Sequence, residues 1–151
     1  MSSDLSRAYD TARTIRGDLP VQRDPRWREF AFGQWEGLTW EQILERWPHL
    51  RDQPPTAASL YTPEGGESFD AVAARVSRSL HELREAGYAN ALVVTHAGPL
   101  HAMLHTLFGE REAEMAEALA VRFSPASVTR IVWEEDGAQL LTLNDVAHLP
   151  E

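Results

Sequence analysis

The chain has 151 residues, a length that suits one domain with a sizeable buried core. Its 14 basic and 23 acidic residues give a formal net charge of −9, which disfavours nucleic acid and anionic membrane surfaces as its main partners. All basic residues are Arg, and Lys and Cys are absent, which excludes Schiff-base chemistry, a P-loop lysine, thiol catalysis, disulfides and cysteine zinc sites. No apolar run approaches a membrane span and the N-terminus has no signal-peptide pattern, so we expect a soluble, cytoplasmic protein.

The first half of the chain predicts two helices with an irregular stretch between them. The first helix is expected over residues 2–15, with one of the two serines at its start as cap and Gly17 as its stop. Residues 29–37, an aromatic and acidic stretch with glycines, are expected to form a loop. Thr39 begins a capping-box pattern, so a short helix should follow it and end at Pro48.

The second half predicts a long loop, a long helix, a buried strand, two further helices and a β-hairpin. The loop contains three prolines, and Ser68 is placed to cap the helix that follows it. The expected ranges are 52–67 for the loop, 69–87 for the long helix, 91–95 for the strand, 100–108 and 110–119 for the two helices, and 128–133 with 139–143 for the hairpin.

His96 lies at the junction between the expected strand and the helix that begins near Leu100. In open α/β sheets, ligands bind at the carboxyl ends of strands, and a helix N-terminus at that place offers free N–H groups to an anion. A histidine there can serve as a ligand, a base or a nucleophile. A buried histidine held by a backbone hydrogen bond is the alternative, and position alone does not decide between them.

Other candidate residues are ambiguous when each is taken singly. Arg7 on the first helix and the two loop carboxylates, Glu29 and Glu36, all fit ordinary solvated side chains. His101 and His105 are four residues apart and, with His96, suggest a metal site. That pattern lacks the carboxylate of the zinc-protease helix motif, and a packed histidine face is the commoner explanation.

Five motifs occur in order along nearly the whole chain. They are Ser-Ser-Asp-Leu-Ser-Arg-Ala from residue 2, Arg-Glu-Phe-Ala-Phe-Gly-Gln-Trp-Glu-Gly from residue 28, Pro-Glu-Gly-Gly-Glu-Ser from residue 63, Val-Val-Thr-His-Ala-Gly-Pro from residue 93, and Leu-Asn-Asp-Val-Ala-His-Leu from residue 143. Together they resemble the histidine phosphatase, or phosphoglycerate mutase-like, superfamily. The last motif is similar to the broad phosphatase branch more than to the glycolytic mutases.

The resemblance implies a single α/β domain over residues 1–151, a three-layer α/β/α sandwich with a mostly parallel sheet. It also implies hydrolysis of a phosphomonoester through a phosphohistidine, without metal or cofactor. The substrate would be a small phosphorylated metabolite, and a ribazole phosphate of the cobalamin pathway, a sugar phosphate and a nucleotide all remain open.

The resemblance also assigns roles to residues. It makes Arg7 a phosphate-binding residue, His96 the second histidine of the site, and Glu29, rather than Glu36, the acid that protonates the leaving alcohol. Arg suits phosphate because its planar fork donates two parallel hydrogen bonds. Ser68 and Asn144 are weaker candidates for substrate binding.

One departure from the family pattern bears on activity. The family's nucleophile lies in an Arg-His-Gly motif on the first strand, and this motif is absent from the 151 residues. We therefore expect the chain to begin inside the fold, without the first strand and helix, to have little activity alone, and to self-associate through an exposed sheet edge. The alternatives are a non-catalytic remnant that binds a phosphorylated ligand or a partner through Arg7 and His96, and a metal hydrolase built on the three histidines.

Overall fold

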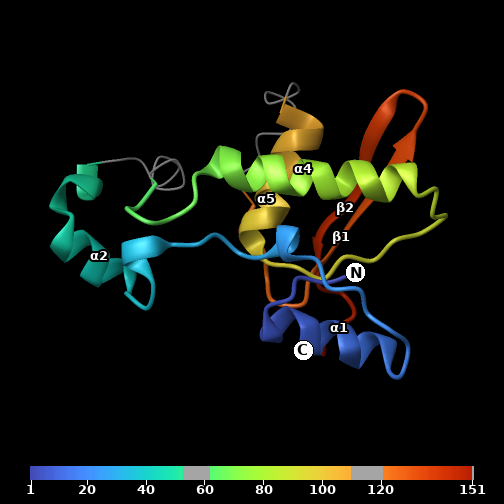
Figure 1. The fold of residues 1–151 in the computed structure, drawn as a ribbon, viewed down its shortest axis with the longest axis horizontal. Helices are drawn as coiled ribbons and strands as arrows, with labels where there is room; N and C mark the ends of the chain where they lie inside the picture. Colours follow the sequence, from blue (N-terminus) through green and yellow to red (C-terminus); the bar gives the residue numbers. More distant parts are fainter. Residues whose placement is uncertain (53–61, 110–120, 151) are drawn as a thin grey trace. The chain divides into compact units, whose positions relative to one another are not determined.

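The computed structural model describes residues 1–52, 62–109 and 121–150 (Figure 1). The expected acidic helix at 110–119 and most of the proline-rich loop lie outside the described residues. Contacts within the chain divide it into two compact units, residues 1–102 and 103–151.

The first unit begins with an extended segment that pairs on both sides. Ser2 forms parallel bridges to Arg23 on one side and Val94 on the other. Its N–H donates to the Gln22 carbonyl at 2.8 Å, and the Ser3 N–H donates to the Val94 carbonyl at 2.9 Å. The expectation that one of these serines caps the first helix is therefore wrong, because both are buried and their backbones are used in parallel pairing.

Parallel pairing is shorter than the sequence predicts. The expected strand 91–95 pairs with the start of the chain only around Val94, and neither backbone polar group of Val93 meets a hydrogen-bond partner among the described residues. Three paired residues form isolated bridges rather than a ladder. In the described residues, the parallel pairing expected for this chain is thus limited to two isolated bridges, both formed by Ser2.

Helix α1 (Ser6–Arg16) follows the extended segment. Leu5 is its N-cap and contributes no side-chain cap, while Gly17, at φ +60°, ends the helix as predicted. Ala8 and Ala12 are buried on one face. The first turn contains no acidic residue, so the positive end of the helix dipole is not balanced by a carboxylate of its own first turn.

Helix α2 (Trp40–Arg46) shows the predicted capping box. The Thr39 hydroxyl accepts from the Gln42 N–H at 3.3 Å, and the Gln42 side chain accepts from the Thr39 N–H at 2.9 Å. Ile43 packs in a small core with Trp35 and Leu50. Short 3₁₀ turns at Pro25–Trp27, Gly33–Trp35 and Pro48–Asp52 flank or precede this helix.

Helix α4 (Phe69–Glu85) is the longest described helix and begins as predicted at the Ser68 cap, whose hydroxyl accepts from the Ala71 N–H at 3.1 Å. The apolar residues of the helix lie on one face, where Val72 and Val76 are fully buried. Ser79 on the same face accepts from the Trp27 indole N–H at 2.8 Å and donates to Asp24 at 2.9 Å. These bonds tie α4 to the segment that leads to Glu29.

Helix α5 (Ala97–Phe108) starts directly after His96, three residues earlier than predicted. Pro99 lies within its first turn, where a missing N–H costs little, so the proline does not mark the helix start. The early start matters because it brings the Gly98 N–H to the beginning of the helix, next to His96.

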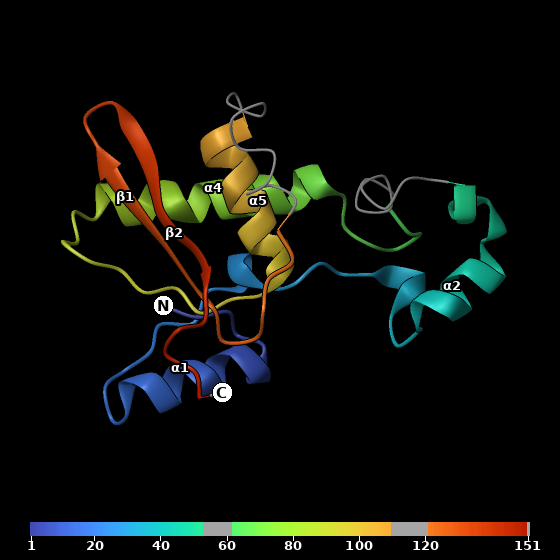
Figure 2. The same cartoon turned by 180° about the vertical axis from the view of Figure 1, so that it is seen from behind.

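The second unit contains the predicted hairpin, β1 (Val128–Glu134) and β2 (Gly137–Asp145), drawn in orange to red in Figure 2. The strands are antiparallel, with Glu134 opposite Gly137 and Val128 opposite Asp145. The pairing is irregular between Val128 and Ile131. In the part of the chain that the structure describes, every helix is too short or too polar to cross a membrane.

Candidate active site

His96 lies between the segment around Val94 and helix α5, and it is half-buried. Its Nε2 atom lies 2.9 Å from the Ser3 hydroxyl. Burial lowers the pKa of His96 below its ordinary value, the positive charges of Arg7 and Arg75 lower it further, and the Glu29 carboxylate acts in the opposite direction. The neutral imidazole is therefore favoured near neutral pH, and the charges of Arg7 and Glu29 both act on it.

Ser3 is a residue of this site that the sequence predicted only as a possible helix cap, with no role in binding or catalysis. It is fully buried, and its hydroxyl accepts from the Leu5 N–H at 3.3 Å while it contacts His96. The hydroxyl therefore joins the histidine to the turn that leads into α1. Ser3 stood inside a matched motif, but local sequence gives no signal for a contact to a residue 93 positions away.

Arg7 lies in the first turn of α1 and is exposed. Its guanidinium makes no hydrogen bond or ion pair with any residue that the structure describes, whereas Arg26, Arg28 and Arg75 are all paired with carboxylates. The Ser6 and Arg7 N–H groups likewise meet no acceptor among the described residues. A free cation beside free N–H groups at a helix N-terminus is an arrangement that suits an anion.

Glu29 is held at the start of α5. Its carboxylate accepts from the Phe30 N–H at 2.9 Å and from the Gly98 N–H at 3.1 Å. A Cβ atom at Gly98 would collide with Glu29 Oε1 and with the Phe30 ring, so only glycine allows this close approach. The Glu29 carboxylate is therefore bound to Gly98, which follows His96 by two residues in the sequence.

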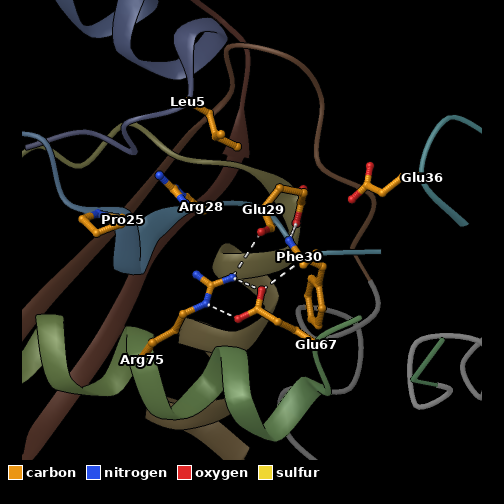
Figure 3. Close-up of a pocket in the computed structure, with 9 residues that line it drawn as sticks. Leu5, Pro25, Arg28, Glu29, Phe30, Glu36, Glu67 and Arg75 are labelled. Carbon is orange, nitrogen blue, oxygen red and sulfur yellow. Dashed lines mark hydrogen bonds and ion pairs between the residues drawn. The ribbon is translucent and has the colours of Figure 1, made fainter. Parts of the chain in front are cut away.

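A hollow of about 390 Å³ adjoins Glu29 (Figure 3). Two ion pairs border it, one between Arg28 and Asp4 at 2.6 Å and one between Arg75 and Glu67 at 3.0 Å. Its lining residues are Leu5, Pro25, Arg28, Glu29, Phe30, Ala31, Glu36, Glu67 and Arg75. The hollow thus brings together carboxylates, paired arginines and an aromatic ring beside the proposed acid.

The remaining candidate residues make local contacts. Glu36 lines the hollow and accepts from the Phe32 N–H at 2.9 Å, and the Ser68 hydroxyl is the cap of α4. Asn144, in the second unit, accepts from the Ser124 N–H at 2.8 Å and has φ +52°. Substrate binding by Ser68 and Asn144 stays a prediction.

The histidines of α5 do not form a metal centre with their neighbours in the described structure. His101 and His105 both lie on α5, as predicted. Across residues 1–52, 62–109 and 121–150, no three His, Asp or Glu side chains gather so as to hold a metal ion.

Comparison with known proteins identifies the family. The model of the histidine phosphatase superfamily, branch 1, matches residues 1–146. An uncharacterised protein of Mycobacterium bovis is 44% identical over 110 residues, a match that covers 69% of this chain and only 29% of that relative. Phosphoserine phosphatase 1 of Hydrogenobacter thermophilus is 31% identical over 153 residues, covering 99% of this chain and 71% of the relative.

The fold agrees with that family. A mycobacterial glucosyl-3-phosphoglycerate phosphatase, solved in complex with inorganic phosphate, is 32% identical and superposes with a TM-score of 0.78, covering 99% of this chain and 77% of its own. The predicted phosphoglycerate mutase-like α/β fold is confirmed by this likeness. The chain belongs to branch 1 of the histidine phosphatase superfamily.

Proposed function

We propose that this chain takes part in hydrolysis of a small phosphomonoester by a mechanism that needs neither metal nor cofactor. The observation that carries the proposal is the convergence of three groups. They are the Arg7 guanidinium, which has no partner among the described residues, the His96 imidazole, whose lowered pKa favours the neutral form, and the Glu29 carboxylate, which is bound at the N-terminus of α5. These are the groups that a phosphoryl transfer needs to bind the anion and to protonate the departing alcohol.

Each group has a separate role in the proposal. Arg7 binds phosphoryl oxygens through paired N–H donors, with the free N–H groups of the α1 N-terminus beside it. His96, held by Ser3, donates a hydrogen bond to the phosphoryl group. In this step Glu29 is in its protonated form, transfers that proton to the leaving oxygen and becomes the carboxylate, so the hollow beside it receives the alcohol part of the substrate.

The nucleophile is proposed to come from a histidine outside these 151 residues, because the sequence contains no Arg-His-Gly motif. An engineered chain in which an Arg-His-Gly segment of the family precedes these 151 residues is called the complete enzyme. The absence of this motif from the sequence also favours a second candidate function, in which the chain binds a phosphorylated ligand through Arg7 and His96 without turning it over.

The substrate class follows from the relatives only as a proposal. Their names give phosphoserine and glucosyl-3-phosphoglycerate as substrates of two of them. Both are small phosphorylated metabolites, and we propose a substrate of that class here. Self-association through an exposed sheet edge and a cytoplasmic location stay predictions.

Phosphate release from 4-nitrophenyl phosphate, measured with EDTA present, tests the proposal. The complete enzyme should turn over, and the 151-residue chain should bind vanadate but release little phosphate. Binding without turnover by both forms would support the non-catalytic function instead. Turnover by the 151-residue chain that is abolished by His96→Ala would make His96 the nucleophile and reverse our assignment of roles.

A further inference from the structure

Arg75 is a paired arginine at the middle of α4 whose side chain is 11% exposed. Figure 3 shows it pointing from the helix toward the loop that carries Glu29. Its Nε and one terminal nitrogen donate to the two Glu67 carboxylate oxygens, both at 3.0 Å. The terminal nitrogens also donate to the Arg26 carbonyl at 2.6 Å and to the Glu29 carbonyl at 3.2 Å.

Glu67 extends these contacts along the loop. Its carboxylate accepts from the Ala31 N–H at 3.1 Å, and its own N–H donates to the Ala31 carbonyl at 2.8 Å. The backbone is therefore held before Glu29, at Glu29 and after it. The Glu29 carboxylate is held separately, by the N–H groups of Phe30 and Gly98.

We propose that Arg75, together with Glu67, is a positioning residue that sets the Glu29 carboxylate on the N-terminus of α5, beside His96. The geometry on which this depends is the double attachment of Glu29, whose backbone is bound from α4 and whose carboxylate is bound from α5. The consequence for catalysis rests on the proposed function, whereas the positioning itself does not.

The chemistry of the guanidinium explains why an arginine is needed here. Its planar fork reaches a carboxylate on one side and two carbonyl oxygens on the other, and a lysine ammonium does not reproduce that geometry. Loss of the fork would leave the Glu67 carboxylate and two carbonyls without these donors. The loop would then relax, and the Glu29 carboxylate would no longer be fixed on Gly98.

Hydrogen exchange of the Gly98 amide, followed by NMR in the 151-residue chain, tests the positioning. Arg75→Met should raise its exchange rate about tenfold or more and move its resonance toward that of Glu29→Gln, because the carboxylate no longer protects the N–H. Arg75→Lys should lie between Arg75→Met and the unmodified chain. Arg78→Met is the matched control, since Arg78 is exposed on the same helix, and it should change nothing.

Thermal unfolding of each variant shows whether it is folded, and Glu67→Gln gives the same test with a smaller change if Arg75→Met does not fold. An unchanged Gly98 amide in a folded Arg75→Met or Glu67→Gln variant would overturn the proposal. A uniform rise in exchange across all amides of the first unit, Gly98 included in proportion, would also overturn it, because it would indicate a merely structural role.

Turnover of the complete enzyme distinguishes a failure of the positioning from a failure of the proposed function. Arg75→Met should lower kcat about 10- to 100-fold for an alkyl phosphate, whose leaving group needs a proton, and about threefold or less for 2,4-dinitrophenyl phosphate. Equal losses for both substrates would contradict the catalytic consequence. If Arg75→Met raises the exchange rate of the Gly98 amide but lowers kcat equally for both substrates, Arg75 positions Glu29 and the assignment of Glu29 as the acid is wrong.

Discussion

The structure holds the proposed anion-binding side of the site, Arg7 and His96, differently from the proposed acid-bearing side, Glu29. On the first side, His96 makes one side-chain hydrogen bond, to Ser3, and Arg7 makes none with any described residue. On the second side, Glu29 is bound through both its carboxylate and its carbonyl. In the proposed function, the Arg7 cation is thus left free to meet an anion, whereas the Glu29 side chain is fixed before any substrate arrives.

The largest expected effect is on the fixed side. In the complete enzyme, Glu29→Gln should lower turnover ~10²- to 10⁴-fold, with the greatest loss for alkyl phosphates, because the amide cannot protonate the leaving oxygen. Glu36→Gln is the matched control, since Glu36 lines the same hollow and its carboxylate accepts a hydrogen bond from the Phe32 N–H rather than from α5. A larger loss in Glu36→Gln would transfer the role to Glu36.

A smaller but clear effect is expected on the free side. Arg7→Met should weaken vanadate binding by about tenfold or more, because charge-assisted hydrogen bonds of ~1.5 to 3 kcal/mol are lost. Isothermal titration calorimetry on the 151-residue chain measures this without any need for turnover. Arg13→Met, an exposed change later in α1, should leave the affinity as it is, and equal losses in both variants would show a nonspecific charge effect.

The contact between Glu29 and α5 can also be disturbed by a substitution at Gly98, its partner on the helix. Gly98→Ala should destabilise the fold by about 1–3 kcal/mol in urea unfolding, because the new Cβ meets Glu29 Oε1 and the Phe30 ring. Gly109→Ala, where the nearest atom is 3.7 Å away, is the control and should cost far less. A Gly98→Ala variant as stable as the control would mean that the two segments do not pack this closely.

The smallest expected effect is the pH dependence of stability from His96. Burial, and then the charges of Arg7 and Arg75, lower the pKa of His96 in the folded state. The stability it contributes is therefore present above the ordinary value of 6.5 and is lost as the pH falls below that value. His96→Gln should flatten the unfolding free energy between about pH 7.5 and 5, and an unchanged slope would contradict this.

Asp24 contributes to the pH dependence of stability at lower pH than His96 does. Burial opposes charge on Asp24, but hydrogen bonds from Arg26 and Ser79 hold its pKa below the ordinary value of 3.8. Its contribution to stability is present above 3.8 and is lost as the pH falls further, so it does not overlap the histidine's window.

Much of the fold was predictable because its signals are local. The Ser68 cap predicted the start of α4, the capping box at Thr39 predicted α2, and two short strand-like runs, residues 128–133 and 139–143, predicted the hairpin. The order of five motifs predicted the family. In each case the evidence lies within about ten residues of the chain or in motif order, which sequence displays directly.

The contacts that arrange the site were not predictable because they join distant residues. Ser3 and His96 are 93 positions apart, Glu29 and Gly98 are 69 apart, and Arg75 and Glu29 are 46 apart. Ser2 or Ser3 was expected to cap the first helix because serine favours that position, but their N–H groups bond to the Gln22 and Val94 carbonyls, and this parallel pairing overrode the local preference. Arg75 on a helix resembles any solvated arginine until the loop packed against it is known.

The most direct test of the account is to locate where inorganic phosphate binds. In an NMR titration of the 151-residue chain, we expect saturable shifts at the Ser6 and Arg7 amides and at the His96 ring, with little movement of the Glu29–Gly98 contact. The same titration of Arg7→Met should show these shifts weakened about tenfold or more. Saturable shifts elsewhere in the chain, or equal binding by Arg7→Met, would contradict the assignment of this site.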